Sequence, residues 1–439
     1  MWLTLLDTPG NAPKNPLESA LRLARTGGLA WLDGGLEHGR EGRFSFVSTA
    51  PCEVIEQLDA GPSALALLDR LGVPAPPPAA TPLRPEDVPL WVGHVAYDAV
   101  APSPRDPSAQ RGVPVLRFAR YDAWYAFDHL EARGYLVGDD RAACERLRAR
   151  LDREPLTPDE LAFHSEGLDV TPADQHRAAV QQALGLIREG ELYEINLARR
   201  FRAHFSGNPL GLFLRMRAQS PVPLGYFVAA PTHAVAGRSM ERFLRFRAGD
   251  RSLYSAPIKG TLARRGDDAG EATQLCADPK ERAEHAMVVD LMRNDLSRVC
   301  RVGSVEVDEL MAVLPFAGLS HLVSTVTGTV RPEITLRTLL EHTLPPGSVT
   351  GTPKARVLCA IAALETAARG VYTGCVGFVD RAGGCSLAVA IRTAIVADGV
   401  VHYAAGGGIV ADSDPQRETD ETELKALLFL DALAAERAS

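Results

Sequence analysis

The chain has 439 residues, of which 46% are hydrophobic and 23% charged, and its formal net charge is −8. This length exceeds that of one ordinary domain, so we expect two domains or one large layered unit. The charge is spread along the chain without basic blocks, which argues against nucleic acid as a partner. The seven cysteines are scattered and lack CxxC spacing, which indicates reduced thiols. The sequence has neither an apolar run of membrane-spanning length nor a signal-peptide pattern, so we expect a cytoplasmic protein without a membrane partner.

Two proline-rich loops, residues 72–88 and 101–113, interrupt short apolar runs in the first part of the chain. A polar, irregular stretch follows at 151–171. A helical pattern then begins at Thr171-Pro172 and stops at Gly190. We therefore predict an N-terminal domain over residues 1–155 and a second domain over 170–437.

Strand-like segments alternate with helices beyond this boundary. Asp398-Gly399 separates two β-branched runs, which is typical of a tight turn between antiparallel strands. We predict an α+β fold in which large antiparallel sheets form a sandwich-like core flanked by helices. The predicted strands are Leu192–Phe205, Ala234–Phe246, Leu322–Val330, Tyr372–Val379, Leu387–Val396 and Val400–Ala405.

A first acidic helix is predicted from Asp278-Pro279 to about Arg298, with Asp278 as its N-cap. Glu281 falls three residues after the cap, where a capping-box glutamate belongs. Glu284 lies one turn further on the same face and is the better candidate for function.

A second acidic helix begins at Asp414-Pro415 and carries Glu418, Glu421 and Lys425, which point one way because of their three- and four-residue spacings. Two helices that each offer carboxylates suit a magnesium ion whose remaining ligands are substrate and water. When either helix is taken alone, a solvated face with an ordinary Glu-Lys pair is the better explanation.

Two further patterns suggest anion binding. In the predicted strand Leu387–Val396, Arg392 stands among alanines and could grip a carboxylate, although a structural acid could hold it instead. Gly406, Gly407 and Gly408 follow a predicted strand, so their backbone amides could approach an anion closely.

Lys259 lies between an apolar strand end and a glycine, in the segment Pro257–Thr261. Partial burial would lower the pKa of its amine and make it a nucleophile. Most lysines are solvated, so spacing alone does not establish this role.

A set of motifs in fixed order resembles the family of anthranilate synthases, aminodeoxychorismate synthases and isochorismate synthases. The resemblance covers residues 172–435, and a weaker one extends into the N-terminal part. The motifs are ELYEINLARRF (191–201), SMERFL (239–244), PIKGT (257–261), EHAMVVDLMRNDLSRVC (284–300), HLVSTVTG (321–328), PPGSVTGTPKAR (345–356), YTGCVGFVD (372–380), AIRTA (390–394), GGGIVADSDP (406–415) and ETDETELKA (418–426).

The residue before the Gly-Thr pair separates activities in that family. Anthranilate synthases typically have alanine there and aminodeoxychorismate synthases have lysine, which this chain has as Lys259. The isochorismate and salicylate branch uses a general-base lysine in the strand that corresponds to residues 191–201, where this chain has Glu194, Ile195 and Asn196. The resemblance therefore implies an aminodeoxychorismate synthase component I, which acts in folate supply through a covalent lysine intermediate. An anthranilate synthase component I and a non-catalytic homologue are the alternatives.

The resemblance also implies roles for individual residues. Glu241 is implied as general acid and base. Glu284 and Glu421 are implied as magnesium ligands, with Glu281 and Glu418 close by. The residues implied to bind substrate are Gly260, Thr261, His321, Ser348, Tyr372, Arg392, Gly406, Gly407, Gly408 and Lys425.

Ammonia needs a source, and Gly374-Cys375-Val376-Gly377 does not have the nucleophile spacing of a glutaminase. A separate glutaminase subunit is therefore expected as a partner. The N-terminal region resembles the tryptophan-binding part of the family. This resemblance leaves three alternatives open: tryptophan regulates this chain, is a buried structural ligand, or does not bind.

Overall fold

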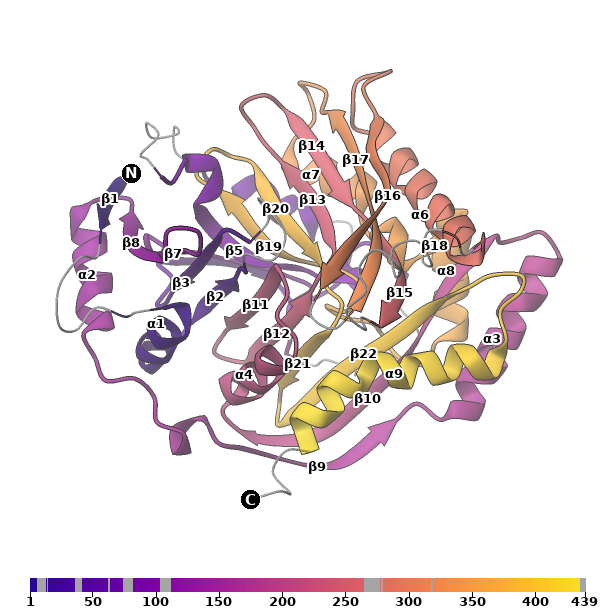
Figure 1. Cartoon of the computed structure of the whole chain (residues 1–439), viewed down its shortest axis with the longest axis horizontal. Helices are drawn as coiled ribbons and strands as arrows, with labels where there is room; N and C mark the ends of the chain where they lie inside the picture. Colours follow the sequence, from indigo (N-terminus) through magenta and orange to yellow (C-terminus); the bar gives the residue numbers. More distant parts are fainter. Residues whose placement is uncertain are drawn as a thin grey trace.

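The computed structural model describes residues 1–5, 13, 15–35, 42–61, 64–73, 82–102, 112–263, 277, 279–316 and 319–434. Within these residues the chain forms two large antiparallel sheets, one of 12 and one of 10 strands, with helices around them (Figure 1). The predicted α+β class with antiparallel sheets is confirmed.

The first sheet follows the strand order β1 (Trp2–Leu5), β8 (Arg133–Gly138), β7 (Ala123–Asp128), β3 (Phe44–Ser48), β2 (Ala30–Asp33), β11 (Leu224–Ala229), β12 (His233–Ser239), β21 (Thr393–Ala397), β22 (Val400–Ile409), β10 (Glu194–Gly207) and β18 (Gly351–Thr352), and β9 (Phe163–Val170) also pairs with β10. The second sheet follows the order β15 (Ile258–Ala263), β17 (Leu319–Thr329), β14 (Ser252–Ala256), β13 (Arg242–Phe246), β20 (Cys385–Val389), β19 (Cys375–Asp380), β5 (Pro89–Val95), β6 (Leu116–Arg120) and β4 (Glu53–Gln57), and β16 (Glu306–Phe316) also pairs with β17.

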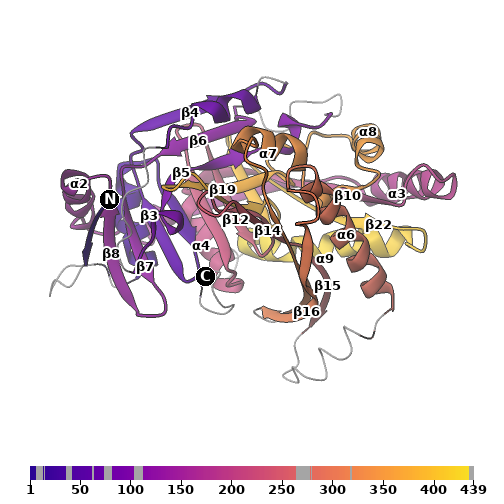
Figure 2. The ribbon, with the colours of Figure 1, turned by 90° about the horizontal axis from the view of Figure 1, so that it is seen from above.

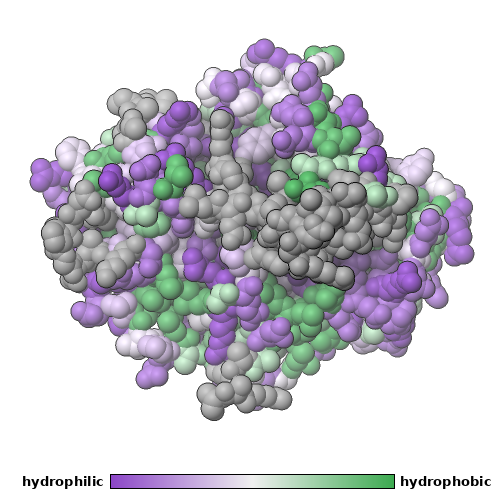
Figure 3. All heavy atoms as spheres, in the orientation of Figure 1, coloured by the Kyte–Doolittle hydropathy of each residue, from purple (hydrophilic) through white to green (hydrophobic). Residues whose placement is uncertain are grey.

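The helices lie on the outer sides of the two sheets (Figures 1 and 2). Their bounds are α1 (Pro16–Leu23), α2 (Arg141–Leu151), α3 (Ala173–Arg188), α4 (Pro209–Gln219), α6 (Pro279–Ser297), α7 (Leu336–Thr343), α8 (Lys354–Leu364) and α9 (Pro415–Ala434). On the face shown in Figure 3, hydrophilic side chains alternate with smaller hydrophobic groups.

Apolar side chains fill the space between the sheets and the space under the helices. Phe46 and Trp124 of the first sheet pack with Val92 of the second in one buried cluster. On the outer face of the first sheet, Phe213 of α4 packs against Trp31 of β2. Strands covered on both faces are buried along their whole length, which is why they read as continuous apolar runs.

Local signals in the sequence placed several element ends correctly. The predicted helix after Thr171-Pro172 is α3, and Gly190 ends it in the left-handed region with φ +77°. The side chain of Asp414 accepts a hydrogen bond from the backbone of Arg417 at 2.9 Å and caps α9. Asp398-Gly399 joins β21 to β22 with both φ values positive, as an antiparallel hairpin requires. The helix predicted after Asp278 is α6, although Asp278 itself lies outside the described residues.

Two predicted strands are each divided between the sheets, so these predictions were wrong in detail. The segment Ala234–Phe246 contributes β12 to the first sheet and β13 to the second. The segment Leu387–Val396 contributes β20 to the second sheet and β21 to the first. Arg392 turns the chain at this second crossing with φ +52°, so it does not stand on one face of a continuous strand.

The two crossings lie beside each other. The backbone N–H of Val389 donates to the carbonyl of Glu241 at 3.0 Å, and that of Arg238 donates to the carbonyl of Arg392 at 3.0 Å. Glu241 and Arg392 are therefore both located where the chain passes from one sheet to the other.

Strands from residues 1–155 and from 170–437 are mixed in both sheets. In the first sheet β2 pairs with β11, and in the second β5 pairs with β19. The division into two sequence domains stays a prediction, but the sheets extend across it. Among the described residues no helix is long and apolar enough to cross a membrane. The cysteines described by the structure are free thiols, in agreement with the sequence, and Cys276 lies outside the described residues.

Candidate functional site

Lys259 points into a group of carboxylates rather than into solvent. Its Nζ lies 3.2 Å from Oε1 of Glu194, on β10, and 3.6 Å from Oε2 of Glu284, near the start of α6. The side chain of Lys259 is 17% exposed and that of Glu194 is 4% exposed. Strand β15 thus places the lysine where it contacts both the first sheet and α6.

The pKa of Lys259 is raised, so the prediction of a lowered pKa was wrong. Burial alone lowers this pKa because it disfavours the charged ammonium. The negative charges of Glu194, Glu284 and Glu421 outweigh burial and favour the protonated amine. The predicted lowering followed from burial, whereas the acids that raise the pKa lie on other elements of the fold.

The predicted acidic residues of α9 lie beside the glycines of β22. A Cβ atom placed on Gly407 would come within 3.2 Å of Oε2 of Glu418 and 3.8 Å of Oε1 of Glu421. The hydroxyl of Ser413 donates to Oε1 of Glu418 at 2.7 Å and fixes this buried carboxylate. Glu421 also pairs with Lys425 at 2.6 Å.

Gly406, Gly407 and Gly408 lie inside β22 instead of following a strand, because the ladder with β10 continues through all three. The ladder between β21 and β22 ends at Tyr403, so the other edge of β22 extends past its neighbour at the glycines. A Cβ atom on Gly408 would lie 2.5 Å from Oε1 of Glu194 and 2.6 Å from Nζ of Lys259. Glycine at this position therefore leaves the space in which Lys259 and Glu194 meet.

Glu241 is a buried carboxyl group at the crossing from β12 to β13, with 4% of its surface exposed. Burial raises its pKa to about 7, while the hydroxyl of Ser348 and the charge of Lys259 act in the opposite direction. The effect of the Lys259 charge on this pKa means that the two groups are within electrostatic range of each other. A carboxyl group with a pKa near neutrality can both give and take a proton.

Arg392 and Lys425, both predicted to hold carboxylates, are bonded to backbone carbonyls. Nη1 of Arg392 donates to the carbonyl of Lys425 at 2.5 Å, and Nζ of Lys425 donates to the carbonyl of Gly406 at 2.9 Å. These bonds connect the crossing at Arg392 to α9 and β22. The role of both side chains in substrate binding stays a prediction.

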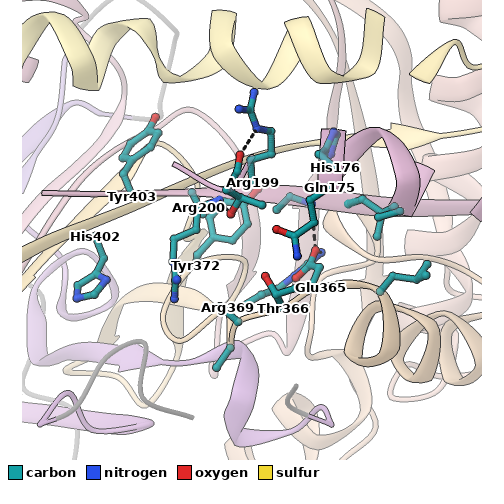
Figure 4. Close-up of a pocket in the computed structure, with 18 of the residues that line it drawn as sticks. Gln175, His176, Arg199, Arg200, Glu365, Thr366, Arg369, Tyr372, His402 and Tyr403 are labelled. Atoms are coloured by element: carbon teal, nitrogen blue, oxygen red, sulfur yellow. Dashed lines mark hydrogen bonds and ion pairs between the residues drawn. The ribbon is translucent and has the colours of Figure 1, made fainter. Parts of the chain in front are cut away.

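Tyr372 is buried beside Arg369 and lines a small cavity of about 50 Å³ (Figure 4). Burial raises the pKa of its hydroxyl, and the positive charges of Arg369 and Arg392 partly oppose this. The other walls of the cavity come from α3, β10 and β22, including Gln175 and His402. The positive charge of Arg392 thus acts on the Tyr372 hydroxyl.

The remaining predicted residues surround the Lys259 strand. Thr261 faces His321 in the ladder between β15 and β17, and His321 is buried. Gly260 lies between Lys259 and Thr261, where the register of this ladder shifts. The structure does not describe the side chains of Thr261 and Glu281, so the predictions for them stay open.

Glu194 was not among the predicted site residues, although it accepts a hydrogen bond from the Lys259 amine at 3.2 Å. In the sequence, Glu194 stood out, with Ile195 and Asn196, as lacking the base lysine of the isochorismate branch, and it was given no role of its own. This strand was itself the signal, because the resemblance implies a catalytic side chain on it in the isochorismate branch.

The carboxylates exceed the amines in this site. Glu194 and Glu284 pair with Lys259, and Glu421 pairs with Lys425. Glu418 lies with Glu421 beside Gly407, and the charge of Lys259 acts on Glu241. Within the described parts of the chain, no three His, Cys, Asp or Glu side chains form a complete metal site. An excess of carboxylate oxygens without a complete protein cage fits a hard cation that also needs oxygen atoms from a substrate.

Comparison with known proteins identifies the class. Residues 57–431 match the model of the chorismate binding enzyme family, so the chain belongs to this family and is a chorismate-utilising enzyme. It is 33% identical over 364 residues to anthranilate synthase component 1 of Lactococcus lactis, a match that covers 77% of this chain and 79% of the relative.

Two further relatives show the range of reactions in the family. The chain is 36% identical over 314 residues to aminodeoxychorismate synthase component 1 of Escherichia coli, covering 71% of this chain and 68% of the relative. Its fold matches the crystal structure of anthranilate synthase component I from Streptococcus pneumoniae, with a TM-score of 0.76 and 29% identity over 90% of this chain and 94% of the other.

Proposed function

We propose that the chain converts chorismate and ammonia to 4-amino-4-deoxychorismate, in the supply of folate. The observation that carries this proposal is the position of the Lys259 amine among buried carboxylates, 3.2 Å from Glu194. The family resemblance adds that lysine at this position is typical of aminodeoxychorismate synthases. A surface lysine would not support the proposal.

In the proposed reaction the Lys259 amine attacks C2 of the chorismate ring, and the C4–O bond breaks. Glu241 gives its proton to the departing hydroxyl, which leaves as water. Ammonia then forms a bond to C4 while the C2–N bond breaks and the electron pair returns to the lysine. The carboxylate of Glu241 takes a proton from the ammonia nitrogen, which restores the starting state, and the enolpyruvyl group stays on the ring.

We propose Glu284 and Glu421 as magnesium ligands, with Glu418 and Glu281 close by. A bound magnesium ion would balance the acidic excess and anchor the ring carboxylate of chorismate. Arg392, Tyr372 and Lys425 are proposed to hold the substrate carboxylates, with Gly260, Thr261, His321 and Ser348 along the ring.

Ammonia is proposed to come from a separate glutaminase subunit, because the relatives are named as component 1 of a synthase. Free ammonia at high concentration should replace this subunit in an assay of the isolated chain.

Anthranilate synthase component I is the second candidate. Relatives named anthranilate synthase are more frequent than those named aminodeoxychorismate synthase, and the solved structure described above has that name. In this case Lys259 would not form a covalent intermediate.

Product analysis by mass separates the two candidates. Purified protein is incubated with chorismate, magnesium and ammonia, and we expect 4-amino-4-deoxychorismate to accumulate. Lys259→Ala should abolish its formation and prevent the covalent adduct that rapid quenching would otherwise trap. Accumulation of anthranilate, with a rate that Lys259→Ala leaves nearly unchanged, would establish the second candidate instead.

Tryptophan binding is a separate proposal for the N-terminal region. A cavity of about 920 Å³ lies between the sheets, and its wall includes Asp33, Phe46 and Tyr226. Arginines of this wall, such as Arg242, offer positive charges to the carboxylate of tryptophan. Asp33 would have to bind the ammonium group of the ligand, but it already pairs with Arg217 and Arg238.

Calorimetric titration tests this proposal directly. We expect tryptophan to bind weakly, because the ammonium group of the ligand has to compete with Arg217 for Asp33. Phe46→Ala should weaken binding further because it removes an aromatic wall. The absence of any heat at millimolar tryptophan would reject the proposal without affecting the assignment of the reaction.

A further inference from the structure

A buried ion pair lies beside Tyr372 and has no part in the reaction proposed above. Nε and Nη2 of Arg369 donate to the two carboxylate oxygens of Glu365, at 3.0 and 2.7 Å. Glu365 directly follows α8, and the side chains of Glu365 and Arg369 are 8% and 2% exposed. Both residues line the same small cavity as Tyr372 (Figure 4).

The pair supplies hydrogen bonds to one edge of β10, between two of its partner strands. On this edge β18 pairs with the first two residues of β10, and β9 pairs with the second half. Between them, the backbone N–H of Ala198 donates to Oε1 of Glu365 at 3.0 Å. The carbonyl of Asn196 accepts a hydrogen bond from Nη2 of Arg369 at 2.8 Å. The ion pair therefore holds the part of β10 that directly follows Glu194.

The guanidinium group of Arg369 makes five hydrogen bonds, as many as it has N–H groups. Besides the three bonds above, Nη1 donates to the carbonyl of Val349 at 3.1 Å and to the hydroxyl of Thr373 at 3.2 Å. A lysine has three donors and no planar fork, so it could not make all five bonds. The arrangement therefore requires arginine at this position.

The bond to Thr373 leads directly to Tyr372. The hydroxyl of Thr373, which accepts from Arg369, donates to the carbonyl of Tyr372 at 2.6 Å. The backbone N–H of Tyr372 donates to the carbonyl of Arg369 at 3.2 Å, and the guanidinium lies 5.8 Å from the centre of the Tyr372 ring. Thr373 has a φ of +60°, which is rare for a β-branched residue, so its backbone has to be held by its neighbours. Arg369 thus contacts both the ring of Tyr372 and the backbone that carries it.

We propose that Arg369, fixed by Glu365, is a positioning residue that holds Tyr372 against β10 through the hydroxyl of Thr373. The inference rests on the proposed contact of Tyr372 with a substrate carboxylate. That contact lies away from the bonds that form and break, so losing it weakens the binding of substrate and transition state alike. The effect therefore belongs to KM for chorismate rather than to kcat.

The first test is Thr373→Val, which removes the hydroxyl between Arg369 and Tyr372 but keeps the size of the side chain and the ion pair. KM for chorismate should rise by roughly tenfold, the loss expected for one hydrogen bond to a charged group, while kcat stays nearly unchanged. Arg369→Lys should give the same pattern. Because KM is obtained from the consumption of chorismate, the test does not depend on which product forms.

Thr343→Val is the matched control for the loss of a buried hydroxyl. The side chain of Thr343 is also buried, and its hydroxyl donates to the carbonyl of Leu339 at 2.8 Å. This variant should lose a similar amount of thermal stability and keep the KM of the unaltered protein. An unchanged KM in both Thr373→Val and Arg369→Lys would overturn the proposal, as would an equal rise of KM in Thr343→Val.

Tyr372→Phe separates this inference from the proposed function. In the double variant Tyr372→Phe/Thr373→Val, KM should equal that of Tyr372→Phe, because the group that Thr373 positions is already gone. If Tyr372→Phe alone leaves KM unchanged, the proposed contact of Tyr372 fails and the inference fails with it. If Tyr372→Phe raises KM and Thr373→Val adds its full increase in the double variant, the positioning inference alone is wrong.

Discussion

The charge state of Lys259 depends on how many carboxylates around it remain free. In the structure Glu194, Glu284 and Glu421 together raise the pKa of its amine above the ordinary value. A nucleophilic amine has to be unprotonated. If a divalent cation binds Glu284 and Glu421, it offsets two of the three charges that favour the ammonium form, which links cation binding to the reactivity of the lysine.

We therefore expect magnesium to lower the pKa of Lys259. Chemical modification of the amine, followed by mass analysis of the peptide that contains it, should proceed faster with magnesium than with a chelator at the same pH. Glu421→Gln should reduce this difference because it removes one proposed ligand. A modification rate that does not respond to magnesium would contradict the proposed metal site.

We expect the activity to depend on pH because of the ionisation of Glu241. Its pKa is raised to about 7, so the carboxyl group is protonated below this pH and loses its proton above it. The first step needs the protonated form, so kcat/KM for chorismate should fall as pH rises through about 7. The measurement is a pH profile between pH 5.5 and pH 9, a range chosen around the raised pKa.

Glu241→Gln serves as the control for that profile. It should lower kcat by roughly 10²–10⁴-fold, the usual contribution of a general acid or base, and remove the ionisation. A profile that is flat in the unaltered protein would contradict the assignment of Glu241.

At the scale of elements, the site is formed where strands change sheets and where β22 passes α9. Glu241 and Arg392 occupy two adjacent crossings, and the glycines of β22 leave space for the acids of neighbouring elements. Gly408 has the tightest surroundings of these, since a methyl group there would lie 2.6 Å from Nζ of Lys259. The site therefore depends on the absence of a side chain in a strand as much as on the side chains that are present.

We expect Gly408→Ala to displace the Lys259 amine from Glu194. Activity should fall strongly, and the covalent adduct trapped by rapid quenching should decrease, because the amine no longer points at the ring. Gly185→Ala, in α3, is the matched control: no heavy atom lies within 4 Å of the added methyl group. It should keep full activity and raise the free energy of unfolding by about 0.4–1 kcal/mol. Normal adduct formation in Gly408→Ala would contradict the steric argument.

At the scale of the whole molecule, the N-terminal and C-terminal parts share both sheets. Trp31 of β2 and Trp91 of β5 are buried, and each lies on a strand that pairs with a strand of the later part. Removing residues 1–155 would leave β11 and β19 each with an unpaired edge and would expose the core between the sheets.

We therefore expect a fragment of residues 170–437 not to fold independently. It should be poorly soluble, and its circular dichroism should show no cooperative thermal transition. Co-expression with a fragment of residues 1–155 should restore soluble protein, because the missing strands are then supplied. Cooperative unfolding of the isolated later fragment would contradict this expectation and support two independent domains.

Features that depend on neighbours along the chain could be predicted from the sequence. The starts of α3 and α9, the turn at Asp398-Gly399, the two acidic helices and the motifs of the chorismate binding enzymes follow from local propensity and spacing. The sequence also indicated the candidate roles of Lys259 and Glu241, through resemblance to the family.

Which distant residues meet could be seen only in the folded protein. It divided Leu387–Val396 between two sheets, placed Gly408 against Lys259, and showed Glu194 as the hydrogen-bond partner of the lysine. The raised pKa of Lys259 belongs here as well, since it results from acids on β10, α6 and α9. Local patterns repeat at fixed spacing along one element, whereas contacts between elements depend on how whole sheets pack, and no short window of sequence contains that information.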